Sequence, residues 1–288
     1  MLWIFLALIA AFTESLKDYF SKRKMKKVNP MLMTWAFFTF TFIVLLPTIF
    51  FLQIPKLDEI FFIASFANAI VFLFAINLYM KAIESSDLSI TLPMIAFTPA
   101  FMLIVSPIII GEFTNVFGVA GILLIVFGAY FLKIKESNKG LLEPFKVLLK
   151  ERGPKLMLIV AFLFSITAST IKLAIQHSNP LTALLFVYFL ETIIGTAWLI
   201  SRKELKLEEV KKNWKGFAAV GIIMAINELA FFNAVTLTLA SFAIAVKRLS
   251  ILFGSAWGFL FFKEGEWKQR IAGALIMIAG VAVIYVLG

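Results

Sequence analysis

The stretch that decides the fold occurs twice, and its first copy, residues 89–130, reads SITLPMIAFTPAFMLIVSPIIIGEFTNVFGVAGILLIVFGAY. The second copy, residues 241–282, reads SFAIAVKRLSILFGSAWGFLFFKEGEWKQRIAGALIMIAGVA. The copies align without a gap at an offset of 152 residues, and they share Glu112 with Glu264 and two glycines each, which are Gly121, Gly128, Gly273 and Gly280. Each copy predicts an apolar helix, a short turn that carries the glutamate, and a second apolar helix. Glycines seven residues apart lie on one helical face, where they let helices in lipid approach closely.

The composition of the 288 residues predicts an integral membrane protein. Hydrophobic residues make up 61% of the chain and charged residues 15%, whereas soluble domains average about 45–50% apolar and ~25% charged residues. The chain has no Cys and a single His, His177, which excludes clustered His or Cys metal sites and Cys nucleophiles. We expect no cofactor. The net charge of +10 comes from basic residues between the hydrophobic runs, so we expect it to set membrane topology rather than to bind nucleic acid.

Ten segments hold the roughly 20 mostly apolar residues that a helix needs to cross a bilayer. They are residues 2–21, 29–52, 59–82, 87–110, 115–134, 155–176, 180–201, 214–236, 240–262 and 267–287. The longest polar interval, Lys135 to Gly153, divides them into five and five. We therefore predict a first repeat at 1–134, a cytoplasmic linker at 135–153 and a second repeat at 154–288. Because five is odd, the second repeat enters the membrane from the opposite side, which gives an all-α fold of two inverted-topology repeats.

The distribution of Lys and Arg predicts the orientation of the chain in the cell membrane. Of the 27 basic residues, 22 lie in the odd-numbered loops or at the span ends that border them, counted from the loop between the first and second spans, and only Lys56 lies in an even-numbered loop. Cytoplasmic loops carry an excess of Lys and Arg. The odd-numbered loops are therefore predicted to be cytoplasmic and both termini to lie outside.

Ionisable residues inside the predicted spans are candidates for function, because an intramembrane charge is unfavourable unless it is paired or faces water. The candidates for substrate binding or ion coupling are Glu14, Lys172, Glu191, Glu228, Lys247 and Arg248. Glu228 and the two adjacent cations are predicted at similar depths, about 10–15 Å from the turn at residues 237–240. An ion pair between Glu228 and one cation is therefore expected. Adjacent residues point about 100° apart on a helix, so the second cation is left for a substrate carboxylate or phosphate.

The remaining charges allow structural as well as functional interpretations. Glu191 is predicted near the membrane midplane, where it could carry a coupling proton, since burial favours a protonated carboxyl group, or could receive a substrate amine. Lys172 could instead extend to the membrane interface, and Glu14 could pair with a lysine of its own helix. For Glu112 and Glu264, which end helices at turns, we expect a structural role.

Prolines distinguish the helix predicted at 87–110 from its counterpart at 240–262. The first contains Pro93, Pro99 and Pro107, and the second contains none. Proline removes an intrahelical hydrogen bond and kinks a helix, so the three prolines are candidate hinge residues. Ile251 stands where Pro99 maps, and we therefore expect hinge behaviour to differ between the repeats.

The repeated pattern also carries a family resemblance. It comprises Ala82, Ser89, Thr98-Pro99, Gly111-Glu112, Gly121 and Gly128 in the first copy, and Ala234, Ser241, Glu264, Gly273 and Gly280 in the second, with the runs 245–250 and 261–264. This pattern resembles the ten-helix EamA-type branch of the drug/metabolite transporter superfamily. The resemblance implies a central cavity lined by helices one to four and six to nine, with helices five and ten at the edge. It also implies transport of amino acids, other small metabolites or drugs, with proton coupling or exchange.

Together these features predict a secondary active transporter that moves small metabolites, above all amino acids or related organic ions, by alternating access. The alternative is a flippase for a lipid-linked or amphiphilic intermediate on the same fold, with Arg248 as an anion clamp. An enzyme is not expected, because no span holds a His or a pair of Asp residues. The expected partners are a small-molecule substrate and the lipid bilayer. We expect a monomer, with a dimer through the glycine stripes as the alternative.

Overall fold

The computed structural model describes residues 1–24, 28–86, 91–133, 151–254, 256 and 267–288. Its helices in the first repeat are α1 (Leu2–Lys24), α2 (Pro30–Leu45), η1 (Leu46–Phe51), α3 (Glu59–Ser85), η2 (Leu92–Phe97), α5 (Thr98–Ile110) and α6 (Val116–Lys133). Those of the second repeat are α8 (Arg152–Gln176), α9 (Pro180–Ser201), α10 (Leu207–Thr236), α11 (Ala240–Lys247) and α13 (Trp267–Leu287). Each of the ten predicted spans contains helix, whereas most of the predicted linker and Glu264 lie outside the described residues.

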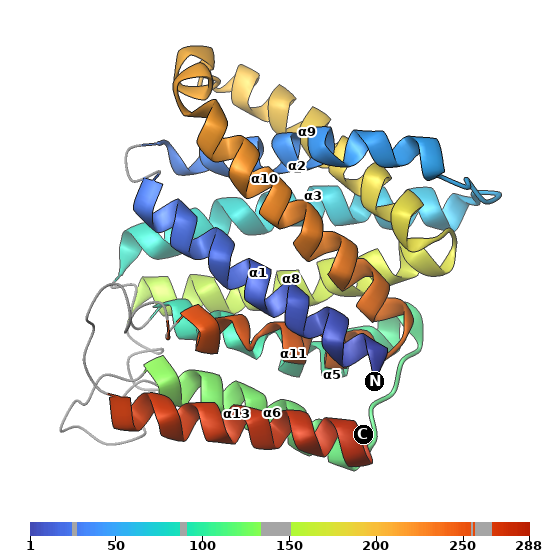
Figure 1. The fold of residues 1–288 in the computed structure, drawn as a ribbon, viewed down its shortest axis with the longest axis vertical. Coiled ribbons are helices and arrows are strands. Elements are labelled where there is room, and N and C mark those ends of the chain that lie inside the picture. The colour runs from blue at the N-terminus through green and yellow to red at the C-terminus, as the bar shows by residue number, and fades with distance from the viewer. Residues whose placement is uncertain (25–27, 87–90, 134–150, 255, 257–266) are drawn as a thin grey trace.

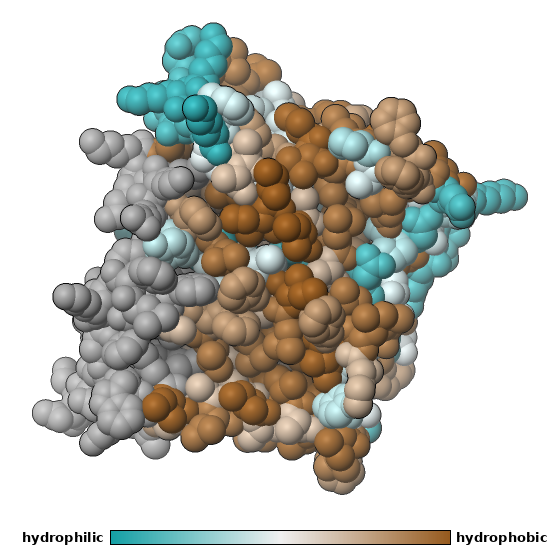
Figure 2. All heavy atoms as spheres, in the orientation of Figure 1, coloured by the Kyte–Doolittle hydropathy of each residue, from teal (hydrophilic) through white to brown (hydrophobic). Residues whose placement is uncertain are grey.

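The helices and their surface fit a bilayer. Five described helices are long and apolar enough to cross a membrane, and three shorter apolar helices accompany them: Met94–Ile110, Val116–Phe131 and Ile271–Leu287. Figure 2 shows a hydrophobic surface across the middle of the molecule, with hydrophilic residues at its upper left and along its right side. Figure 1 places both chain termini at the same end, which a chain with an even number of spans requires. The protein is a multi-pass membrane protein.

The second helix of each repeat begins at an Asn-Pro pair, as the sequence indicates. The Asn29 side chain accepts a hydrogen bond from the Met31 N–H at 2.8 Å, and the Asn179 side chain accepts one from the Thr182 N–H at 2.8 Å. Proline suits the first turn because its missing N–H would have no partner there. In the first repeat, α2 gives way to η1 at Pro47, where the sequence predicted one helix to residue 52.

Equivalent helices of the two repeats pack as related pairs. The first long helix of each repeat packs on the third long helix of the other: α1 packs on α10, and its counterpart α8 packs on α3. A Cβ atom on Gly121 would lie 2.8 Å from the Gly280 carbonyl oxygen, and one on Gly128 would lie 2.8 Å from that of Gly273. Gly121 of α6 thus faces Gly280 of α13 and Gly128 faces Gly273, so these equivalent helices run antiparallel (Figure 1). An inverted repeat requires this relation, and the glycine stripes pack against each other within one chain.

Buried asparagines join the repeats at two further places. Asn68 on α3 donates to the Thr167 carbonyl of α8 at 2.8 Å. Asn227 on α10 donates to the Ala10 carbonyl of α1 at 2.6 Å and to the Thr13 hydroxyl at 3.1 Å. Both asparagines are fully buried. The contact of Asn227 holds α10 against α1. The candidate residues Glu14 and Glu228 directly follow Thr13 and Asn227 in the sequence.

Candidate functional site

The site begins where α11 ends, at the two adjacent cations. The sequence predicted one helix over 240–262, but α11 stops at Lys247 and Arg248 is its C-cap. The Leu249 N–H then donates to the Val246 carbonyl at 2.9 Å, three residues back, and the Leu252 N–H donates to the Leu249 carbonyl at 2.9 Å. Three-residue spacing is tighter than that of an α-helix. The fourth helix of the second repeat therefore changes geometry at its charges without a proline.

The corresponding change in the first repeat occurs at Thr98, where η2 passes into α5. Pro99 has no N–H to donate to the Ile95 carbonyl, four residues back. That oxygen instead accepts from the Thr98 backbone N–H and from the Thr98 hydroxyl, the latter at 2.7 Å. Pro99 therefore stands in the first turn of α5, and Pro107 lies inside the same helix. The side chain of Pro93 lies outside the described residues, although the η2 backbone around it is described.

Lys247 forms the expected ion pair with Glu228. The Nζ–Oε1 distance is 3.4 Å, and the two side chains are 13% and 11% exposed. The Lys247 ammonium also lies 4.1 Å from the centre of the Phe231 ring, close enough for a cation–π interaction. The ion pair that the similar depths predicted between Glu228 and one of the two cations is confirmed, and its cation is Lys247.

Arg248 is left without a bonded carboxylate. Its Nη2 donates to the Thr98 hydroxyl of the other repeat at 3.1 Å. Its Nε is buried and has no hydrogen-bond partner among the described residues, and no described carboxylate forms an ion pair with it within 4 Å. Glu14 on α1 interacts electrostatically with both Lys247 and Arg248, although its bonded partner is Lys17. Glu14 thus also lies beside this group of charges.

Glu191 is a buried carboxyl group on α9, only 4% exposed. Among the residues that the structure describes, no Lys or Arg lies within 4 Å of it. Its electrostatic neighbour is Glu228, and the buried Tyr188 interacts with both. Glu191, Glu228, Lys247, Arg248 and Glu14 therefore form one neighbourhood, which we call the charge cluster.

Lys172 belongs to a separate contact between the repeats. α5 ends at Gly111, whose φ of 68° favours glycine, and the next residue, Glu112, forms an ion pair with Lys172 of α8. Lys172 Nζ also donates to the Thr238 carbonyl at 2.5 Å. Glu112 Oε2 accepts at 2.8 Å from the N–H of Ala240, the first residue of α11. Lys172 is 7% exposed, so its ammonium is enclosed by protein groups of these connections. This contact lies about 10 Å along α11 from the charge cluster.

Sequence reasoning missed the partner of Lys172, although the signal was present. Glu112 and Lys172 both lie at the membrane side that holds the even-numbered loops, and each needs a countercharge. A second contact on that side joins His177 to Asp58, with 2.6 Å between Nδ1 and Oδ2. The pKa of Asp58 is lowered, first by the Phe61 N–H that its carboxylate caps and then by His177.

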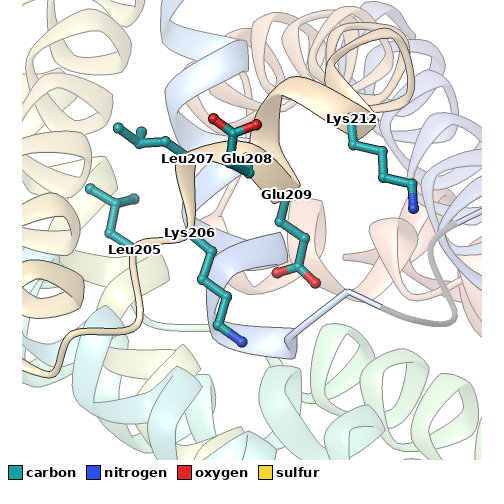
Figure 3. A pocket seen from close by; sticks show the side chains of 6 residues that line it. All are labelled: Leu205, Lys206, Leu207, Glu208, Glu209 and Lys212. Atoms are coloured by element: carbon teal, nitrogen blue, oxygen red, sulfur yellow. The ribbon is translucent and has the colours of Figure 1, made fainter.

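A solvent-open cavity of about 580 Å³ lies away from these charges, on the connection between α9 and α10. Figure 3 shows its lining, which is Leu205, Lys206, Leu207, Glu208, Glu209 and Lys212. It contains none of the predicted site residues. Glu208 pairs at 3.2 Å with Lys211, and both side chains are exposed. The buried charge cluster is therefore the better candidate site.

Two packed repeats with antiparallel equivalent helices and a buried charge cluster define a helical membrane protein of the transporter class. Residues 1–134 and 152–286 match the EamA-like transporter family. The chain belongs to this family and is a membrane transporter of small molecules; members of the family are transporters rather than enzymes.

Solved structures agree with this fold. One crystal structure is similar with a TM-score of 0.75 at 14% sequence identity, over 99% of this chain and 96% of the other. At that identity the likeness concerns the fold alone. No curated protein matches the sequence significantly.

Proposed function

We propose that this protein is a secondary active transporter of small organic ions, above all amino acids or related metabolites, and that the charge cluster lies on the substrate path. The observation that carries the proposal is the state of Arg248. Lys247 has Glu228, whereas Arg248, which is half-buried and has a buried Nε, has no bonded carboxylate among the described residues. Arginine matches a carboxylate with its planar fork of donors, so a carboxylate of the substrate completes this part of the cluster.

Glu191 supplies the second function of the proposed site. It is buried, and none of the described cations is bonded to it. Such a carboxyl group takes either a substrate amine or a coupling proton, because each removes an uncompensated charge from the protein interior. We propose that Glu191 does so, with Glu228 and Glu14 balancing the cations.

Alternating access needs a hinge in each repeat and a contact that closes one side. The changes in helical geometry at Thr98 and at Arg248 supply the hinges, with Pro99 and Pro107, and with Pro93 from the sequence. The Glu112–Lys172 ion pair joins the repeats on the side of the termini. We propose that it belongs to the closed state of that side and that Lys172 acts there rather than on the substrate.

The proposal is tested by flux of a radiolabelled amino-acid mixture into proteoliposomes. Glu191→Gln, Lys247→Ala and Arg248→Ala are each expected to lower the initial rate at least tenfold, while the purified variants keep the elution profile of the folded protein. Glu208→Gln is the matched control, because it removes a carboxylate from an exposed ion pair, and it should transport normally. An imposed proton gradient should stimulate the unmodified protein and not Glu191→Gln.

Two results would contradict the proposal. Normal flux in all three cluster variants would remove the charge cluster from the substrate path. Scrambling of a fluorescent phospholipid by the unmodified protein, without amino-acid flux, would favour the flippase instead.

The proposed orientation has a separate test, because the chain has no Cys of its own. Single cysteines at Lys56 and at Lys203 report opposite sides of the membrane. In intact cells, a membrane-impermeant maleimide should label Lys56→Cys and spare Lys203→Cys; the reverse pattern would place the termini in the cytoplasm.

A further inference from the structure

The two changes in helical geometry contact each other across the repeats. Thr98 begins α5 in the first repeat, and Arg248 caps α11 in the second. α5 packs on α11, and Arg248 Nη2 donates to the Thr98 hydroxyl at 3.1 Å. Thr98 is fully buried. The hydrogen bond therefore joins these two changes of helical geometry.

The Thr98 hydroxyl has little freedom to rotate. Its proton is donated to the Ile95 carbonyl at 2.7 Å. That oxygen lacks the α-helical bond from position 99, because Pro99 has no N–H, and it also accepts from the Thr98 backbone N–H. A hydroxyl has one donor and two acceptor lone pairs. With the donor fixed, a lone pair faces Arg248, so the backbone change at Pro99 determines the direction in which the guanidinium is held.

Fixing one nitrogen of a guanidinium fixes the direction of the others, because the group is planar and rigid. The Nε of Arg248 is buried and has no partner among the described residues. A buried donor without an acceptor is unfavourable. The described protein atoms therefore supply no acceptor for this Nε–H, and a ligand can supply one.

We propose that Thr98 is a positioning residue for substrate recognition: it holds the Arg248 guanidinium so that the Nε edge meets the anionic group of the substrate. This inference rests on the proposed function, since it requires Arg248 to contact the substrate. Thr98 itself does not touch the substrate.

The test measures the concentration dependence of amino-acid uptake in proteoliposomes for Thr98→Val and Thr98→Ser, with the radiolabelled mixture as the probe. Valine keeps the shape and removes the hydroxyl, so the apparent KM should rise about tenfold, as expected for loss of a hydrogen bond to a charged group. The maximal rate should change less than twofold. Serine restores the hydroxyl and should keep the KM within twofold of the unmodified protein.

Competition identifies the chemical group involved. Unlabelled L-leucine and L-leucinamide differ in the carboxylate. Leucine should compete better than leucinamide against the unmodified protein, and Thr98→Val should reduce this preference. A packing role alone would lower the amount of active protein and leave the preference unchanged.

A double-mutant cycle separates this inference from the proposed function. In an Arg248→Lys background, Thr98→Val should add less than a twofold change, because its effect acts through the guanidinium. An unchanged KM in Thr98→Val, or independent effects in the double variant, would overturn the positioning role while the cluster variants still lose transport. Normal transport by Arg248→Ala would instead overturn the proposed function. If Thr98→Val does not fold, Thr98→Ala takes its place in both measurements.

Discussion

Removing Lys172 should destabilise the protein strongly, because it leaves Glu112 as a buried carboxylate without its cation. The two side chains are 9% and 13% exposed, and breaking a buried ion pair by removing one partner costs about 3–5 kcal/mol. At about 2–4 °C per kcal/mol for large domains, Lys172→Met should lower the apparent melting temperature by roughly 10 °C. The assay is tryptophan fluorescence of the purified protein during heating in detergent, at one fixed scan rate.

The control compares an exposed pair of the same kind. Lys211 and Glu208 are 74% and 90% exposed, so Lys211→Met should have little effect on the melting temperature. Adding Glu112→Gln to Lys172→Met removes the unpaired charge and keeps an acceptor for the Ala240 N–H. This double variant should therefore recover most of the lost stability. A melting temperature of Lys172→Met equal to that of Lys211→Met, or a double variant as unstable as Lys172→Met alone, would show that the ion pair does not stabilise the protein.

Two further predictions concern the packing of α6 on α13 and the contact between His177 and Asp58. Gly121→Leu should lower the melting temperature by about 5 °C or more, since overpacking costs about 1–3 kcal/mol and a Cβ there would meet the opposite helix at 2.6 Å. The control is Gly254→Ala, which should not destabilise the protein because a Cβ there meets nothing within 4 Å. Equal losses of melting temperature in the two variants would contradict the close packing of the glycines. The lowered pKa of Asp58 means that its contacts are present above the ordinary Asp pKa and are lost only as pH falls through the lowered value. His177→Ala should raise the Asp58 pKa, as measured by carbon NMR of labelled Asp, and an unchanged titration would show that the cap on α3 alone lowers it.

Much of the fold follows from local signals in the sequence. Apolar runs of sufficient length predict the helices, and the Asn-Pro pairs predict where α2 and α9 begin, because a cap and a first-turn proline act within a few residues. The glycine stripes predict close packing of helices. The pairing of Glu228 with one cation follows from depth, since both are counted from the same short turn.

The rest depends on contacts between the repeats, which local signals do not contain. Lys172 and Glu112 belong to different repeats, and the residues around either one do not indicate which residue pairs with it. The change of geometry at Arg248 has no proline to mark it. It could have been inferred only from the repeat itself, which maps Thr98 onto Ser250, beside the cations.

The duplication has kept the frame symmetric and made the charges asymmetric. At the offset of 152 residues, Lys247 and Arg248 correspond to Ile95 and Ala96, and Glu228 corresponds to Ile76. Both repeats therefore contribute a helix that changes geometry, as alternation between two related states requires, but the second repeat contributes most of the charge cluster. Under the proposed function, a charged substrate would meet this one set of partners while the two repeats rearrange around it. The first repeat would then influence recognition through the contacts that it makes with the cluster, and the proposed role of Thr98 is one of these, because its neutral hydroxyl contacts Arg248.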